Sequence, residues 1–149
     1  MAMIVAICGP ADYIRTTNDI KRVLAVLEDT IKDERVDFYL GEYHNFDLFA
    51  YECAKEYKAR HRGTRLVLIS RFVEQGKIHK NDRYDLILAH DFEKATVGES
   101  IMCRCKWMAE HIDLLICHIL YECGEAFTTF AYARQNNKAV HLIDLYQVF

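Results

Sequence analysis

The chain has 149 residues, with 19 basic against 22 acidic side chains, a formal charge of −3 and 52% hydrophobic residues. This composition favours one domain spanning residues 1–149 and excludes long disorder and collagen-like repeats. The acidic balance argues against a general nucleic-acid binder, which would show a basic surface. Apolar runs are too short for a membrane helix, and the N-terminus lacks the basic start and long apolar stretch of a signal peptide. We therefore expect a cytoplasmic protein without membrane contact.

The first half of the chain alternates short apolar runs with amphipathic stretches. Apolar side chains recur at steps of three and four through residues 20–31, which is the period of a helix. Thr17 or Asn18 is expected to cap this helix, and Asn45 or Asp47 the next one. The predicted elements are a strand at 4–8, a helix at 17–32, a strand at 37–41, a helix at 46–61 and a buried strand at 65–72.

The second half begins with a charged stretch, residues 73–96, that contains one apolar tetrapeptide at 86–89. We expect a long loop with one short strand, and such a loop is either a lid over a ligand or a solvated connection. Regular patterns then return. The predicted elements are a helix at 98–112, a buried strand at 113–120, a helix at 124–137 and a final strand at 139–145.

Alternating strands and helices predict the fold class: a Rossmann-like, doubly wound α/β domain with a mainly parallel sheet and helices on both faces. Ligands of such sheets bind beyond the carboxyl ends of the strands. Three glycines follow predicted strands there, namely Gly9, Gly41 and Gly124. The last two precede helices, whose N–H groups attract anions, although each glycine can equally mark only a tight turn.

Four carboxylates lie in the same loops: Glu42, Asp47, Glu122 and Glu125. Asp47 and Glu125 fall in the first turns of predicted helices, where a carboxylate also serves simply as a cap or a partner of the helix dipole. The sequence contains no known catalytic motif. These carboxylates are therefore candidates for acid–base chemistry without a defined partner.

Cysteine and histidine patterns indicate neither a metal site nor a resident cofactor. Six cysteines without a secretory signal are typical of reduced thiols. Cys103 and Cys105 form a C-x-C pair without a second pair at zinc-site spacing. His44 falls in a candidate site loop, and His118 is expected inside a strand; both are interpreted mainly as structural residues.

Several segments together resemble the small YpsA/YoqJ-like proteins of the SLOG superfamily, which also contains the LOG phosphoribohydrolases and DprA-type domains. The resemblance covers residues 36–145 and rests on the order and spacing of FYLGEYHNFDLF, RYDLILAHDFE, CRCKWMAEHIDLLICHI and ECGEAFTTFAYARQNNKAVHLI. It implies a Rossmann-like fold and binding of nucleotides or nucleotide-derived signals such as ADP-ribose. LOG-type members cleave the N-glycosidic bond of a nucleoside monophosphate.

The resemblance also implies site residues. The family's first glycine loop falls on Gly41, Asn45, Phe46 and Asp47, and its basic helix motif on Arg104, Lys106 and Met108. Its second glycine loop falls on residues 123–127, where only Gly124 is kept and Phe127 replaces a threonine that follows as Thr128. The acidic residue of LOG enzymes would fall on Thr129 or Phe130, neither of which can act as a carboxylate.

The favoured hypothesis is therefore a non-catalytic module that binds a nucleotide or nucleotide-derived small molecule. In it, Arg104 pairs with a phosphate, Tyr43 or Phe127 stacks on the base, and Thr128 donates a hydrogen bond. The alternative is a nucleotide N-glycosidase in which Glu125, Glu122 or Glu42 supplies the carboxylate. The resemblance also implies a homo-oligomer, with the helix that carries Trp107 as a candidate interface, and leaves nucleic-acid binding a minor option.

Overall fold

A computed structural model describes residues 1–14, 16, 18–41, 44–70, 83–89 and 96–145. Within them the chain forms six strands and four helices, which alternate except that β4 is the next described element after β3. In chain order these are β1 (Met3–Cys8), α1 (Asp19–Thr30), β2 (Val36–Leu40), α2 (Asn45–Arg60), β3 (Thr64–Ser70), β4 (Leu86–Ala89), α3 (Val97–His111), β5 (Leu114–Cys117), α4 (Glu125–Gln135) and β6 (Ala139–Leu142).

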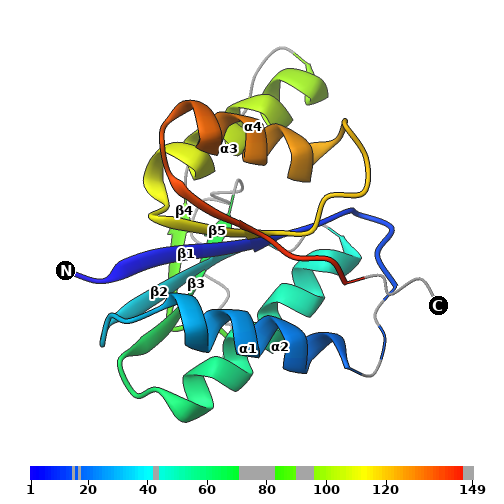
Figure 1. The fold of residues 1–149 in the computed structure, drawn as a ribbon. Coiled ribbons are helices and arrows are strands. Elements are labelled where there is room, and N and C mark those ends of the chain that lie inside the picture. The colour runs from blue at the N-terminus through cyan, green and yellow to red at the C-terminus, as the bar shows by residue number, and fades with distance from the viewer. Residues whose placement is uncertain (15, 17, 42–43, 71–82, 90–95, 146–149) are drawn as a thin grey trace.

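The strands form one parallel sheet in the order β4-β3-β2-β1-β5-β6. Helices α1 and α2 cover one face and α3 and α4 the other (Figure 1). The predicted Rossmann-like, doubly wound fold is confirmed. Because the chain leaves β1 towards β2 and later returns to place β5 on its other side, the strand order reverses between β1 and β5.

Both faces of the central strands are buried, as expected for a parallel sheet covered by helices. Val5 and Ile7 of β1 pack into the core beneath α1 and α2, whereas Ala6 between them packs towards α3 and α4. The α1–α2 side contains the larger aromatic cluster, in which Phe46 of α2 is 1% exposed. This alternation fixes the register of β1 and therefore the position where its loop begins.

Two strands end earlier than the sequence predicts. The apolar run at 113–120 is a strand only to Cys117, and the run at 139–145 only to Leu142. The cause is pairing: Cys117 is in register with the last residue of β1 and the last residue of β6, so the ladder stops there. His118 is therefore not inside a strand, and the rest of the apolar run forms a loop.

The predicted helix caps are confirmed in part. Asn18 is the N-cap residue of α1, as predicted, although its side chain makes no capping hydrogen bond. The N-cap residue of α2 is His44 rather than Asn45 or Asp47, and its side chain makes no capping hydrogen bond either. Asp19, 1% exposed, instead accepts hydrogen bonds from the backbone N–H and hydroxyl of Thr16, at 2.8 and 2.7 Å. Burial raises the pKa of Asp19, but these bonds and one from Tyr13 outweigh it, so the pKa lies below its usual value.

The predicted long loop at 73–96 contains the predicted short strand as β4, while residues 73–82 and 90–95, which would form a lid, lie outside the described residues. In the part of the chain that the structure describes, no helix is long and apolar enough to cross a membrane. Trp107 of α3, a candidate interface residue, stacks within its own chain on Tyr39 and His111, with ring centroids 6.0 and 4.1 Å apart.

Candidate functional site

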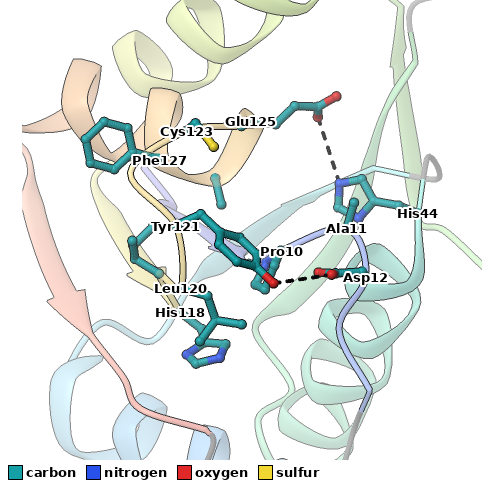
Figure 2. A pocket seen from close by; sticks show the side chains of 14 residues that line it. Pro10, Ala11, Asp12, His44, His118, Leu120, Tyr121, Cys123, Glu125 and Phe127 are labelled. Carbon is teal, nitrogen blue, oxygen red and sulfur yellow. Dashed lines mark hydrogen bonds and ion pairs between the residues drawn. The ribbon is translucent and has the colours of Figure 1, made fainter.

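A cavity of about 370 Å³ lies beyond the carboxyl ends of β1 and β5, where the strand order reverses. Three segments form it: the loop after β1, the loop after β5 and the first turn of α4, with His44 closing one side (Figure 2). Its lining residues are Gly9, Pro10, Ala11, Asp12, His44, His118, Ile119, Leu120, Tyr121, Cys123, Gly124, Glu125, Ala126 and Phe127. This is the place where doubly wound sheets bind their ligands.

Two glycines shape the cavity for different reasons. A Cβ on Gly9 would lie 2.3 Å from Cε2 of the buried Phe46 ring, so only glycine lets the β1 loop pass this close to α2. Gly124, the residue that caps α4, has φ 92° and ψ 178°, a conformation that other residues rarely adopt, although the space around it is open. Both were predicted as site residues: Gly9 because it follows the first strand, and Gly124 because a glycine lets a ligand approach the backbone closely.

A smaller cavity of about 70 Å³ adjoins the first and shares Gly9, His44, Glu125 and Ala126 with it. Arg104 of α3 lines this smaller cavity and is 8% exposed. Its guanidinium donates a hydrogen bond to Oε2 of Glu125 at the start of α4. An ion pair thus joins the predicted basic residue to one of the predicted carboxylates.

His44 faces the same carboxylate. Its Nε2 lies 3.9 Å from Oε2 of Glu125 and 3.9 Å from Oδ2 of Asp47, so the imidazole is placed between two acidic groups. Figure 2 shows His44 and Glu125 directed towards each other across one side of the cavity. The hydroxyl of Tyr121 donates a hydrogen bond to Asp12 at 3.4 Å, which connects the β5 loop to the β1 loop (Figure 2).

Cysteines line both cavities: Cys8 and Cys105 line the smaller one and Cys123 the larger one. Cys8 and Cys117 are neighbours on β1 and β5 with sulfur atoms 3.4 Å apart. The hydrogen bond between them, together with burial, raises the pKa of Cys8 well above its usual value, and burial raises that of Cys105. Cys123, in contrast, is exposed and lines the larger cavity. Among the described residues, no group of three or more His, Cys, Asp or Glu is arranged to hold a metal ion.

The structure brings most of the predicted binding residues to these two adjoining cavities. Gly9, Gly124, Glu125 and Phe127 line the larger cavity, and Gly41, Asp47 and Arg104 line the smaller one.

Other predicted residues lie elsewhere. Asn45 lines a separate hollow beside Tyr13 and Phe49. The hydroxyl of Thr128 donates to the carbonyl oxygen of Gly124 at 2.8 Å. Thr128 and Glu122 are not among the residues that line the two cavities. Glu42 and Tyr43 lie outside the described residues.

Asp12, His44, His118 and Tyr121 line the larger cavity but were not predicted as binding residues. Asp12 and Tyr121 lie in loops that follow predicted strands, where ligands were expected, but no motif singled them out within these loops. His44 and His118 were interpreted as structural residues. His118 is 2% exposed, and its Nδ1 lies 3.1 Å from the carbonyl oxygen of Ile143. No local signal in the sequence marks His118, because the strand ends at Cys117 through pairing with β1 and β6.

Comparisons with known proteins give a fold and no family. No protein-family model matches the chain, and no curated protein matches it significantly in sequence. Two solved structures of the molybdenum cofactor carrier protein from Chlamydomonas reinhardtii are similar in fold, with TM-scores of 0.57 and 0.53. Each covers 95% of this chain and 76% of its own, at 14% and 15% identity. Similarity at this level supports the Rossmann-like fold, while the SLOG assignment stays a prediction.

Proposed function

We propose that this protein is a binding module for a nucleotide or nucleotide-derived small molecule, such as an ADP-ribose-like signal, which it senses or sequesters. The observation that carries the proposal is the cavity at the reversal of strand order between β1 and β5. Its volume of about 370 Å³ is in the lower part of the range for small-molecule sites. A mononucleotide or a part of a larger nucleotide derivative suits this size.

The lining offers complementary groups for the parts of such a ligand. The first turn of α4 provides backbone N–H groups that have no partner within the helix, which suits a phosphate or another anion. Phe127 provides an aromatic face for a base, and Asp12 provides acceptors for ribose hydroxyls. These assignments place the base and the anionic group at the first turn of α4 and the sugar at the loop after β1.

Binding without conversion is favoured over catalysis. The structural neighbours are, by name, carriers of the molybdenum cofactor, and a carrier of this fold fits a module that holds a small molecule. The alternative, an N-glycosidase, is supported by the carboxylate of Glu125 at the cavity wall. Its ion pair with Arg104 suits a group that stabilises positive charge better than one that donates a proton.

The test is a thermal-shift screen against AMP, ADP, NAD, ADP-ribose and other nucleoside monophosphates, with chromatography of every mixture. A ligand at about 100 times its Kd adds roughly 2.7 kcal/mol, which raises Tm by about 5–10 °C for a chain of this size. The variant Ala11→Trp places an indole at an exposed position that lines the cavity and should abolish the shift. Its control is Ala25→Trp, the same change at an exposed position of α1.

Three outcomes separate the alternatives. A shift that Ala11→Trp abolishes and Ala25→Trp keeps, with the compound recovered intact, supports the binding module. Release of a free base, lost in Glu125→Gln, establishes the N-glycosidase instead. A shift that survives Ala11→Trp places the ligand elsewhere and refutes the proposed site. The expected homo-oligomer stays a prediction, and light scattering on the same samples tests it.

A further inference from the structure

Oε2 of Glu125 is where two basic side chains meet. It accepts a hydrogen bond from the guanidinium of Arg104 and lies 3.9 Å from Nε2 of His44. The Arg104 side chain is 9% exposed, whereas that of Glu125 is 32% exposed. The buried cation is therefore fixed in the interior, while its carboxylate partner keeps access to solvent.

Glu125 also separates Arg104 from the larger cavity. Glu125 and His44 line both cavities, but Arg104 lines only the smaller one. Among the described residues that line the larger cavity there is no lysine or arginine, whereas the carboxylates of Asp12 and Glu125 are present. Within this described lining, an anionic ligand would meet the two negative side chains and no fixed positive one. The arginine that lines the adjoining smaller cavity, Arg104, is the one that Glu125 already pairs with.

We propose that the Glu125 carboxylate stands in for the anionic group of the ligand. On binding, a phosphate or carboxylate of the ligand replaces it on Arg104, and the Glu125 side chain turns towards solvent. This inference rests on the proposed function and deepens it, because it makes an anionic group the requirement for tight binding.

The exchange is physically favourable because Arg104 is paired in both states. An unpaired buried charge is strongly destabilising, so an empty site needs an internal partner for the guanidinium. A phosphate offers a stronger one, because a phosphate monoester carries more negative charge than a carboxylate and also forms two parallel hydrogen bonds with a guanidinium. His44 alone does not bind the anionic group, because Asp47 lies 3.9 Å from it and the negative charge of Asp47 repels an incoming anion. The preference for anionic ligands therefore comes from Arg104.

The experiment measures binding of AMP, inorganic phosphate and adenosine by isothermal titration calorimetry. In Glu125→Gln the competing charge is gone, and in Glu125→Asp the charge stays at the start of α4 but the side chain is one methylene shorter. Both variants should bind AMP and phosphate about tenfold more tightly than the original protein, because a charge-assisted hydrogen bond no longer competes. Adenosine binding should change less than about twofold. The double variant Glu125→Gln/Arg104→Met should lose this gain in affinity for AMP and phosphate.

The control is Glu110→Gln, the same charge change at an exposed position of α3, which should leave all three affinities unchanged. Weaker or unchanged AMP binding in Glu125→Gln overturns the exchange, and so does absence of AMP and phosphate binding to that variant. The proposed function is judged separately by the wider ligand screen and Ala11→Trp. If a nucleotide derivative binds in the screen and Glu125→Gln shows no gain in affinity for AMP, the exchange is refuted and the proposed function stands.

Discussion

Replacing Gly9 by alanine tests whether close packing against Phe46 sets the position of the β1 loop. The added Cβ would lie 2.3, 2.5 and 2.7 Å from three atoms of the Phe46 ring, all well inside contact distance. The ring has little room to move, because it packs edge-on against Tyr13 and Phe49 with centroids 5.0 and 5.4 Å away. The clash must therefore displace either the loop or this aromatic cluster.

Overpacking of a buried cluster by one methyl group typically costs about 1–3 kcal/mol. For a chain of this size such a loss lowers Tm by roughly 2–12 °C. Gly98 provides the matched control, because it lies in the first turn of α3 with no atom within 4 Å of an added Cβ. Alanine there should stabilise the protein by about 0.5–1 kcal/mol, since glycine is the poorer helix former. The same change from glycine to alanine should therefore lower the free energy of unfolding at position 9 and raise it at position 98.

Urea unfolding of Gly9→Ala, Phe46→Leu and the double variant measures the coupling between the two positions. The smaller leucine should relieve the clash, so that Gly9→Ala costs at least about 1 kcal/mol less in the Phe46→Leu background. A loss below about 0.5 kcal/mol for Gly9→Ala, or an equal loss in both backgrounds, would refute the argument. The loop would then adapt to the methyl group, and Gly9 would not be required for the shape of the cavity.

Three further predictions follow from single residues. Gly124→Ala should lose about 1–3 kcal/mol through backbone strain alone, so no substitution of a neighbouring side chain should restore stability in urea unfolding. Cys123 should react with a thiol reagent before Cys8 and Cys105, whose pKa values are raised, and a bound ligand should slow this reaction, as peptide mapping would show. The pKa of Asp19 is lower in the folded protein than in the unfolded chain, so its contribution to stability is present above about pH 4 and is lost as the pH falls through the folded-state pKa. The free energy of unfolding of Asp19→Asn, measured in urea between about pH 2 and 6, should therefore depend less on pH.

The periodicity of apolar residues predicted the elements and their order because each one depends on local patterning. Parallel strands buried on both faces appear as continuous apolar runs, and amphipathic helices repeat every three to four residues. Where an apolar run ends as a strand is instead decided by its partners. The run from Leu114 to Leu120 looks uniform, yet pairing stops at Cys117, where β1 and β6 also end.

The candidate site was predictable in outline and not in detail. The switch-point rule placed the candidate residues in the loops that follow the predicted strands. The strand order, which selects the loops after β1 and β5 among them, comes from the structure. The rule could not place Arg104 against Glu125, because that contact joins α3 to α4 and depends on how the two helices pack. Nor could it identify His44, which reaches both cavities only because it is the capping residue of α2.

The two faces of the sheet contribute unequally to the site. From the α1–α2 side, Phe46 requires a glycine in the β1 loop, so packing there determines where the loop runs. From the α3–α4 side come the charges that lie beside the cavity, because Arg104 belongs to α3 and Glu125 begins α4. Substitutions on the first side should therefore change stability and the shape of the cavity together, as expected for Gly9→Ala. Exchange of Glu125 or Arg104 should change the preference for anionic ligands while the β1 loop keeps its position.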